Sequence, residues 1–93
     1  MIKTFGNKST KELYVKGRSK KLPSEIWKRA IIKLEMIDIA ASIDDLKVPP
    51  SNNLEKLKGS LKDFYSIRIN DQYRIIFKFI NGNAYEVEIT DYH

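Results

Sequence analysis

The last three residues of the chain, Asp91-Tyr92-His93, are side chains that could transfer protons at a reacting phosphate. Histidine is the side-chain type that titrates near neutral pH, and His93 is the single histidine of the sequence. Tyr92 could instead stack on a nucleic-acid base. Because chain termini often fray, an end without any chemical role is the simpler alternative.

Apolar and polar side chains alternate in three segments of the C-terminal half, which predicts strands over 65–69, 73–80 and 85–90. Their apolar residues must share one face, because a slip of one residue would turn them all outward. Most of these apolar residues have odd numbers. Odd-numbered residues of neighbouring strands share a face only if the loop between the strands has an odd number of residues. Loops of three residues, at 70–72 and 81–83, are the simplest solution.

This register sets Arg68 opposite Arg74, and Lys78 opposite Glu86. Two arginines directly opposed normally repel each other. A phosphate between them would reverse the sign, because arginine presents a planar fork of donors that matches phosphate oxygens. The alternative is that one arginine turns to solvent or to an acid such as Asp71.

These residue types suit RNA cleavage in which a ribose 2′-hydroxyl attacks the adjacent phosphate. A base removes the hydroxyl proton, an acid protonates the leaving 5′-oxygen, and cations stabilise the phosphorane; the reaction requires no metal. The candidates for charge stabilisation are Arg68, Arg74 and Lys58, and those for proton transfer are His93, Tyr92, Asp91 and Glu55.

The elements that must position these residues include a short strand over 2–5 and two helices. Ser9 and Glu12 have the spacing of a capping box, and Gly17 provides a stop, so a helix of about two turns is expected between them. Pro23 suits the first turn of a second helix, which should run to about Ala41.

An apolar stripe at helical spacing marks the buried side of that second helix: Ile26, Ala30, Leu34, Ile37 and Ala41. Charged residues, Lys33 among them, should lie largely on the opposite side. Ser42 and Asp45 could cap one further turn, after which Val48-Pro49-Pro50 predicts an extended connection. We therefore expect one α+β domain over 1–93, with two N-terminal helices on one face of a mainly antiparallel sheet of four to five strands.

The charge of the chain is unevenly distributed. Lys and Arg total 17 against 12 acids, a net charge of +5, and the first 23 residues hold seven bases and one acid. A basic surface favours polyanions such as RNA, although it can also serve only to keep a small protein soluble. The residues expected to bind RNA are Arg18, Lys20, Lys21, Arg68 and Lys78.

Other classes of protein are disfavoured by composition. The chain has no cysteine and a single histidine, so we expect no metal site and no cofactor. It opens without an apolar signal core and contains no apolar run near the ~20 residues of a membrane span. A cytoplasmic protein that does not enter membranes is the expectation.

The chain resembles the HigB group of the RelE toxin superfamily over nearly its whole length. The resemblance rests on motifs in a particular order: Met1-Ile2-Lys3-Thr4-Phe5, Ile37-Asp38-Ile39-Ala40, Leu54-Glu55-Lys56-Leu57-Lys58-Gly59, Tyr65-Ser66-Ile67-Arg68-Ile69-Asn70, Tyr73-Arg74-Ile75, Phe77-Lys78-Phe79-Ile80-Asn81-Gly82 and Asp91-Tyr92-His93.

The resemblance implies a RelE-like fold and an mRNA endonuclease that acts in the ribosomal A site. It also implies a HigA-like helix-turn-helix antitoxin, through which the toxin–antitoxin complex binds its own operator DNA. Arg68 aligns with a basic position of the same face, and the residues that match family active-site positions are Lys58, Arg74, Asp91, Tyr92 and His93.

The sequence departs from the family at one position. Some HigB toxins carry a histidine in a Leu-His-Pro-Leu-Lys-Gly segment, where this chain has Glu55 followed by Lys56. A glutamate can act as a base but cannot serve as a cation at neutral pH. The alternative is that Glu55 is only a surface partner of Lys56 or Lys58.

Two other functions remain open from the sequence. One is a gyrase poison of the ParE kind, which shares the fold without being a nuclease. The other is a non-catalytic nucleic-acid-binding module that uses the basic N-terminal third. Arg74 together with Asp91-Tyr92-His93 favours the nuclease.

Overall fold

The computed structural model describes residues 1–91 and opens with helix α1, Lys8–Lys16. The side chain of Asn7 caps this helix by accepting a hydrogen bond of 3.0 Å from the backbone N–H of Thr10. The predicted capping box at Ser9 is therefore wrong, because Asn7 supplies the cap and the helix begins before Ser9. Gly17 ends the helix at φ 79°, in the left-handed conformation that glycine adopts without steric cost, as predicted.

Helix α2 spans Ser24–Ile39, with Pro23 before its first residue and Ala40 after its last. The predicted stripe is buried up to Ile37, and Ala40 takes the last buried position in place of Ala41. Lys33 is also buried, contrary to expectation, because the side chain of Asn52 accepts a hydrogen bond from its ammonium group.

Short 3₁₀ helices follow α2. Ser42 and Asp45 form the predicted capping box of η1, Ile43–Lys47. The extended connection expected after it is only partly present, because Pro50–Asn52 form a second 3₁₀ turn, η2, and the Asn52 side chain is fully buried.

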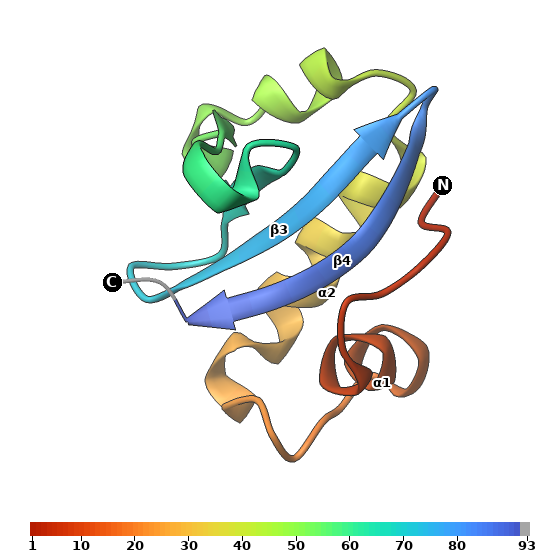
Figure 1. The fold of residues 1–93 in the computed structure, drawn as a ribbon. Coiled ribbons are helices and arrows are strands. Elements are labelled where there is room, and N and C mark those ends of the chain that lie inside the picture. Colours follow the sequence, from red (N-terminus) through yellow and green to blue (C-terminus); the bar gives the residue numbers. More distant parts are fainter. Residues whose placement is uncertain (92–93) are drawn as a thin grey trace.

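Four antiparallel strands lie in the order β1-β2-β3-β4. They are β1 (Glu55–Lys56), β2 (Tyr65–Arg68), β3 (Tyr73–Ile80) and β4 (Asn83–Asp91), and a third 3₁₀ turn, η3 (Gly59–Leu61), lies between β1 and β2. The strand expected over 2–5 is reduced to two parallel bridges with β4, at Ile2 and Phe5. This N-terminal segment follows the outer edge of β4, and α2 crosses behind β3 and β4 (Figure 1).

The first hairpin has the predicted register. Arg68 lies opposite Arg74, and Ile69 N–H donates to the carbonyl of Tyr73 across the loop of three residues. The Asn70 side chain stabilises that loop by accepting hydrogen bonds from the backbone N–H groups of Gln72 and Tyr73.

The second hairpin differs from the prediction. Its turn has two residues, Asn81 and Gly82, with φ of 52° and 79°, as a type I′ turn requires. A β-bulge then adds one residue to β4, where Glu86 has φ 53°. The two turn residues and the one bulge residue together have the same effect as the predicted loop of three residues, so Val87 and Ile89 still face the core. Lys78, however, lies opposite Tyr85 and not Glu86.

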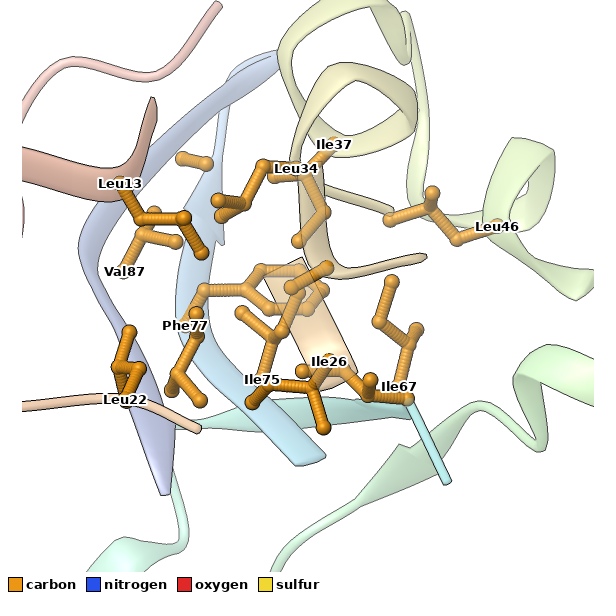
Figure 2. Packing of buried hydrophobic residues seen from close by; sticks show 14 of the residues in the cluster. Leu13, Leu22, Ile26, Leu34, Ile37, Leu46, Ile67, Ile75, Phe77 and Val87 are labelled. Carbon is orange, nitrogen blue, oxygen red and sulfur yellow. The ribbon is translucent and has the colours of Figure 1, made fainter. Parts of the chain in front are cut away.

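The hydrophobic core lies between the helices and one face of the sheet, which is formed by odd-numbered residues except at Ala84, before the bulge of β4. Figure 2 shows Phe77 of β3 among side chains from α2 and the neighbouring strands. Side chains of this size each contribute about 1.5–3 kcal/mol when fully buried. The core joins these buried residues: Leu13, Leu22, Ile26, Ala30, Leu34, Ile37, Ala40, Leu46, Ile67, Ile69, Ile75, Phe77, Ala84, Val87 and Ile89.

The opposite face of the sheet is partly covered. Ser66, Arg74 and Ile76 are buried there. The covering segment, residues 53–64, contacts this face at one end through the carbonyl of Asn53, bonded to Arg74, and at the other through the ring of Phe64, near Lys78.

The predicted α+β class, with two helices on one face, is confirmed. None of the helices within residues 1–91 has the length and apolar character needed to cross a membrane.

Candidate active site

Arg74 is the centre of a polar network on the covered face of the sheet. Its side chain is 7% exposed. Its Nε donates to the hydroxyl of Ser66 at 2.9 Å, and its Nη2 donates to the carbonyl of Asn53 at 2.7 Å. The guanidinium is therefore held in one orientation by β2 and by the covering segment, as preorganised stabilisation of developing negative charge requires.

Glu55 contributes the negative charge of this network. Its Oε1 lies 3.6 Å from Nη2 of Arg74 and accepts a hydrogen bond of 3.4 Å from the side-chain amide of Asn53. The predicted alternative, a salt bridge with Lys56 or Lys58, is not the pairing found, because β1 directs Glu55 toward Arg74. The Glu55 side chain keeps 45% exposure, so a substrate can reach the carboxylate.

Lys58 shares a shallow surface hollow of about 350 Å³ with Glu55. Lys56, Leu57 and Leu61 complete the lining. Arg74 is not part of this lining and adjoins the hollow through its ion pair with Glu55. Two predicted members, Glu55 and Lys58, therefore share the hollow, and a third, Arg74, contacts Glu55.

Arg68 lies opposite Arg74 in the strand register but points to a different partner. Its guanidinium forms a salt bridge with Asp71 in the loop between β2 and β3. The repulsion expected between opposed arginines is relieved in this way, which is the alternative that the sequence left open. The guanidinium of Arg68 is therefore directed to Asp71, whereas that of Arg74 is held by Ser66 and Asn53.

Asp91 ends the described part of β4, opposite Tyr73, and its Oδ2 accepts a hydrogen bond of 3.1 Å from Gln72. It thus lies beside the loop that follows Arg68. The predicted proton-transfer residues Tyr92 and His93 lie outside the described residues.

The predicted RNA-binding residue Lys78 is held by an ion pair of 2.9 Å with Glu86, and its ammonium lies over the ring of Phe64. The hydrogen bond and the charge of Glu86 raise the pKa of Lys78. Because of the bulge in β4, Glu86 does not lie directly opposite Lys78 in the register, but the two side chains still form the ion pair. Because its charge is already paired, Lys78 has less to offer a phosphate than an unpaired lysine.

Arg18, Lys20 and Lys21 lie apart from this network. They line a different hollow, between α1, the loop after it and the start of α2. Within residues 1–91 this hollow shares no lining residue with the hollow of Glu55 and Lys58. The structure therefore separates the basic loop from the Arg74 network.

The residues that hold the network in place could not be predicted from the sequence. Alternation identifies Ser66 only as a polar strand residue, and no periodic pattern includes residues 51–53. Yet Asn52 donates to the carbonyl of Leu46 at 3.1 Å and accepts from Lys33, which fixes the segment next to Asn53 against α2. Burial lowers the pKa of Lys33, and the charges of Arg29 and Arg68 lower it further. Two adjacent asparagines after a Pro-Pro pair were the only signal for this contact.

Comparisons with known proteins agree on one family. Residues 3–93 match the model of the RelE-like toxin of the type II toxin–antitoxin system HigB. The chain is 40% identical to the protein named Toxin HigB-1 of Vibrio cholerae over 85 residues, covering 90% of each chain. It is 38% identical over 93 residues to the protein named Endoribonuclease HigB of Proteus vulgaris, covering all of both.

Solved structures extend the likeness to the fold. The YoeB–YefM complex from Staphylococcus aureus matches with a TM-score of 0.62 at 20% identity, covering 100% of this chain and 98% of the other. A YafQ mutant from E. coli matches with a TM-score of 0.58 at 16% identity, covering 98% and 91%. The predicted resemblance is confirmed, and the chain belongs to the HigB-like toxins of type II toxin–antitoxin systems, whose partner is an antitoxin.

Proposed function

We propose that this toxin is an endoribonuclease that cleaves mRNA in the ribosomal A site and thereby stops translation. The observation that carries the proposal is the buried Arg74, oriented by Ser66 and Asn53 and paired with the accessible carboxylate of Glu55. A relative named as an endoribonuclease aligns with the whole chain, which supports the same activity.

In the proposed reaction, the ribose 2′-oxygen bonds to the adjacent phosphorus as its proton passes to a base. The bond from phosphorus to the 5′-oxygen breaks, and an acid protonates that oxygen. The products are a 2′,3′-cyclic phosphate and a 5′-hydroxyl. Arg74 and Lys58 stabilise the negative charge of the phosphorane. Glu55, Asp91, Tyr92 and His93 are the candidates for base and acid.

Dependence on the ribosome follows from the few acid–base groups that the chain offers. The ribosome would hold the mRNA in the reactive geometry, which supplies the positioning that a small domain cannot provide alone. This activity places the toxin in the cytoplasm. We further propose a HigA-like helix-turn-helix antitoxin, through which the complex binds its operator DNA.

The test is induction of the toxin alone in bacteria, compared with Arg74→Ala and with a form that lacks Tyr92 and His93. The parent should arrest growth and both variants should relieve the arrest. Arg29→Ala is the matched control, because Arg29 is an exposed arginine of α2 that donates to the carbonyl of Ile69 at 3.3 Å and not to a residue of the Arg74 network. Equal toxicity of all four proteins would contradict the proposal.

Mapping of mRNA 5′ ends after induction then identifies the reaction. New ends within translated codons, and cleavage of purified mRNA only when ribosomes are added, are the expected results. Growth arrest with broken DNA and intact mRNA would instead identify a gyrase poison. Efficient cleavage of naked RNA would contradict the ribosome requirement.

A further inference from the structure

A hollow of about 640 Å³ lies between α1, the loop that follows it and the first turn of α2. We call it the α1–α2 hollow. Its surface is mainly apolar, although lysine residues supply much of it, since their aliphatic stems can line a hollow while the ammonium groups reach the solvent. The proposed cleavage chemistry uses none of its central residues.

Two large apolar side chains face this hollow. Val15, in the last turn of α1, is 67% exposed. Trp27 is half-buried, and its indole N–H already donates to the carbonyl of Leu22 at 2.9 Å. The indole therefore offers a partner its apolar ring and no spare donor. Exposed apolar side chains with a polar rim are typical of protein-binding surfaces.

The rim of the hollow is strongly basic. Among the described residues, Glu12 is the one acid that lines it, and its carboxylate already lies 3.9 Å from the ammonium of Lys16. A complementary partner must therefore be acidic as well as apolar. The basic lining residues are Lys8, Lys11, Lys16, Arg18, Lys20 and Lys21.

Ser19 provides an independent observation. It lines the hollow at 2% exposure, and its hydroxyl has no hydrogen-bond partner among residues 1–91. Buried polar groups in folded proteins are normally paired, so an unpaired hydroxyl beside a hollow indicates a group that is supplied from outside.

We propose that the α1–α2 hollow is the docking site of the antitoxin, for a segment that combines acidic side chains with at least one large apolar side chain. The apolar side chain packs on Val15 and Trp27, the acids pair with the rim, and a polar group of the segment bonds to Ser19. The proposal rests on the membership of a toxin–antitoxin family and does not require the proposed RNA cleavage.

RNA is the competing occupant, because the rim is basic. Protein–nucleic acid interfaces are polar and hydrated, and phosphates would bind the exposed ammonium groups without filling an apolar hollow. The apolar lining and the buried hydroxyl of Ser19 therefore favour a protein segment.

The experiment uses full-length toxin and, as the probe, the protein encoded by the reading frame adjacent to the toxin gene, with affinity measured by calorimetry. Val15→Asp should weaken binding by about 100-fold, because it places a negative charge on the apolar surface that the segment covers. Ser19→Ala should weaken binding by about 5-fold and leave the melting temperature of the free toxin unchanged, since no hydrogen bond within residues 1–91 is lost.

Ile39→Asp is the matched control. Ile39 is an aliphatic residue in the last turn of α2, as Val15 is in α1, but it is 80% exposed and lies outside the hollow. Its substitution should leave the affinity within about 2-fold. Unchanged affinity for both Val15→Asp and Ser19→Ala would overturn the proposal, and so would equal losses from Val15→Asp and Ile39→Asp.

Cleavage of mRNA on ribosomes is measured for the same variants. Val15→Asp and Ser19→Ala should cleave as the parent does. Loss of cleavage with intact antitoxin binding would assign the hollow to RNA and overturn the proposal. A parent toxin that binds the antitoxin but never cleaves would contradict the proposed function and leave the docking result intact. Should Val15→Asp fail to fold, Ser19→Ala decides the matter alone.

Discussion

Basic side chains of this toxin lie in two contrasting environments, one buried and one exposed to solvent. Arg74 is buried, and Ser66 and Asn53 fix its donors. Lys20 and Lys21 are exposed at the rim of the α1–α2 hollow. A buried, oriented cation can stabilise a charge that develops at one point, whereas exposed lysines act over a distance and are screened by salt. The net charge of the chain does not reveal this division.

The sharpest test of the comparison substitutes two arginines that lie directly opposite each other. Arg74→Lys keeps the charge but loses the planar fork that Ser66 and Asn53 orient, so the rate of mRNA cleavage should fall about 100-fold. Arg68→Lys should lower it by less than about 3-fold, because Arg68 is turned to Asp71. The measurement is a cleavage time course on ribosomes, with melting temperatures as the control for folding. Equal losses from the two variants would show that the orientation of Arg74 by Ser66 and Asn53 gives it no special part in cleavage.

Glu55→Gln tests the acidic member of the Arg74 network. The amide preserves the shape of the side chain but removes the charge 3.6 Å from Nη2 of Arg74, so cleavage should fall about 10-fold. A fall of about 100-fold or more would assign proton transfer to Glu55. Unchanged cleavage in the same assay would remove Glu55 from the site.

The exposed group is tested by the double substitution of Lys20 and Lys21 with alanine. Cleavage should fall by less than about 5-fold, and its dependence on salt should become shallower, because the exposed ammonium groups attract mRNA through a long-range field that salt screens. The measurement is ribosome-dependent cleavage across a salt series. A large loss that salt does not alter would contradict the division between the two groups.

Lys33 gives the smallest expected effect and tests what burial does to a second cation. Its pKa is lowered by burial and then by Arg29 and Arg68, so the unfolded chain holds the proton more tightly than the folded one. Stability conferred by this group should therefore rise with pH toward 10.5, its ordinary value.

The measurement is urea unfolding of the parent and of Lys33→Met between about pH 7 and about pH 10, where the difference in free energy of unfolding should shift in favour of the parent as pH rises. A difference that does not change with pH would show that Lys33 titrates alike in both states. Lys28→Met, an exposed substitution on the same helix, is the control for the loss of a lysine from α2.

The strands and the opposition of Arg68 and Arg74 could be predicted because alternation fixes which residues share a face. Once the first loop has three residues, the register follows without further information. The second hairpin was predicted wrongly, since a shorter turn and a bulge cancel in the count. Asn81-Gly82 is the strongest sequence signal for a turn of two residues and could have revealed both.

The surroundings of Arg74 could not be predicted in the same way. The covering segment has no periodic pattern, so its sequence does not indicate that it lies on the sheet. Its position depends on contacts between distant residues, such as Lys33 with Asn52 and Arg74 with Asn53. The residue types of the site were therefore predictable, whereas the burial of Arg74 and the partner of Glu55 required the fold.

The bulge at Glu86 has a consequence for variation in length. The bulge absorbs one extra residue locally, because Lys78 pairs with Tyr85 before it and Ile76 pairs with Glu88 after it. Deletion of Glu86 would therefore leave a regular ladder, in which every remaining residue of β4 keeps its partner and its face. An extra residue elsewhere in β4 has no bulge to absorb it and would turn the residues beyond it to the other face. Natural or engineered relatives should therefore tolerate a change of length at Glu86 more readily than at neighbouring positions of β4.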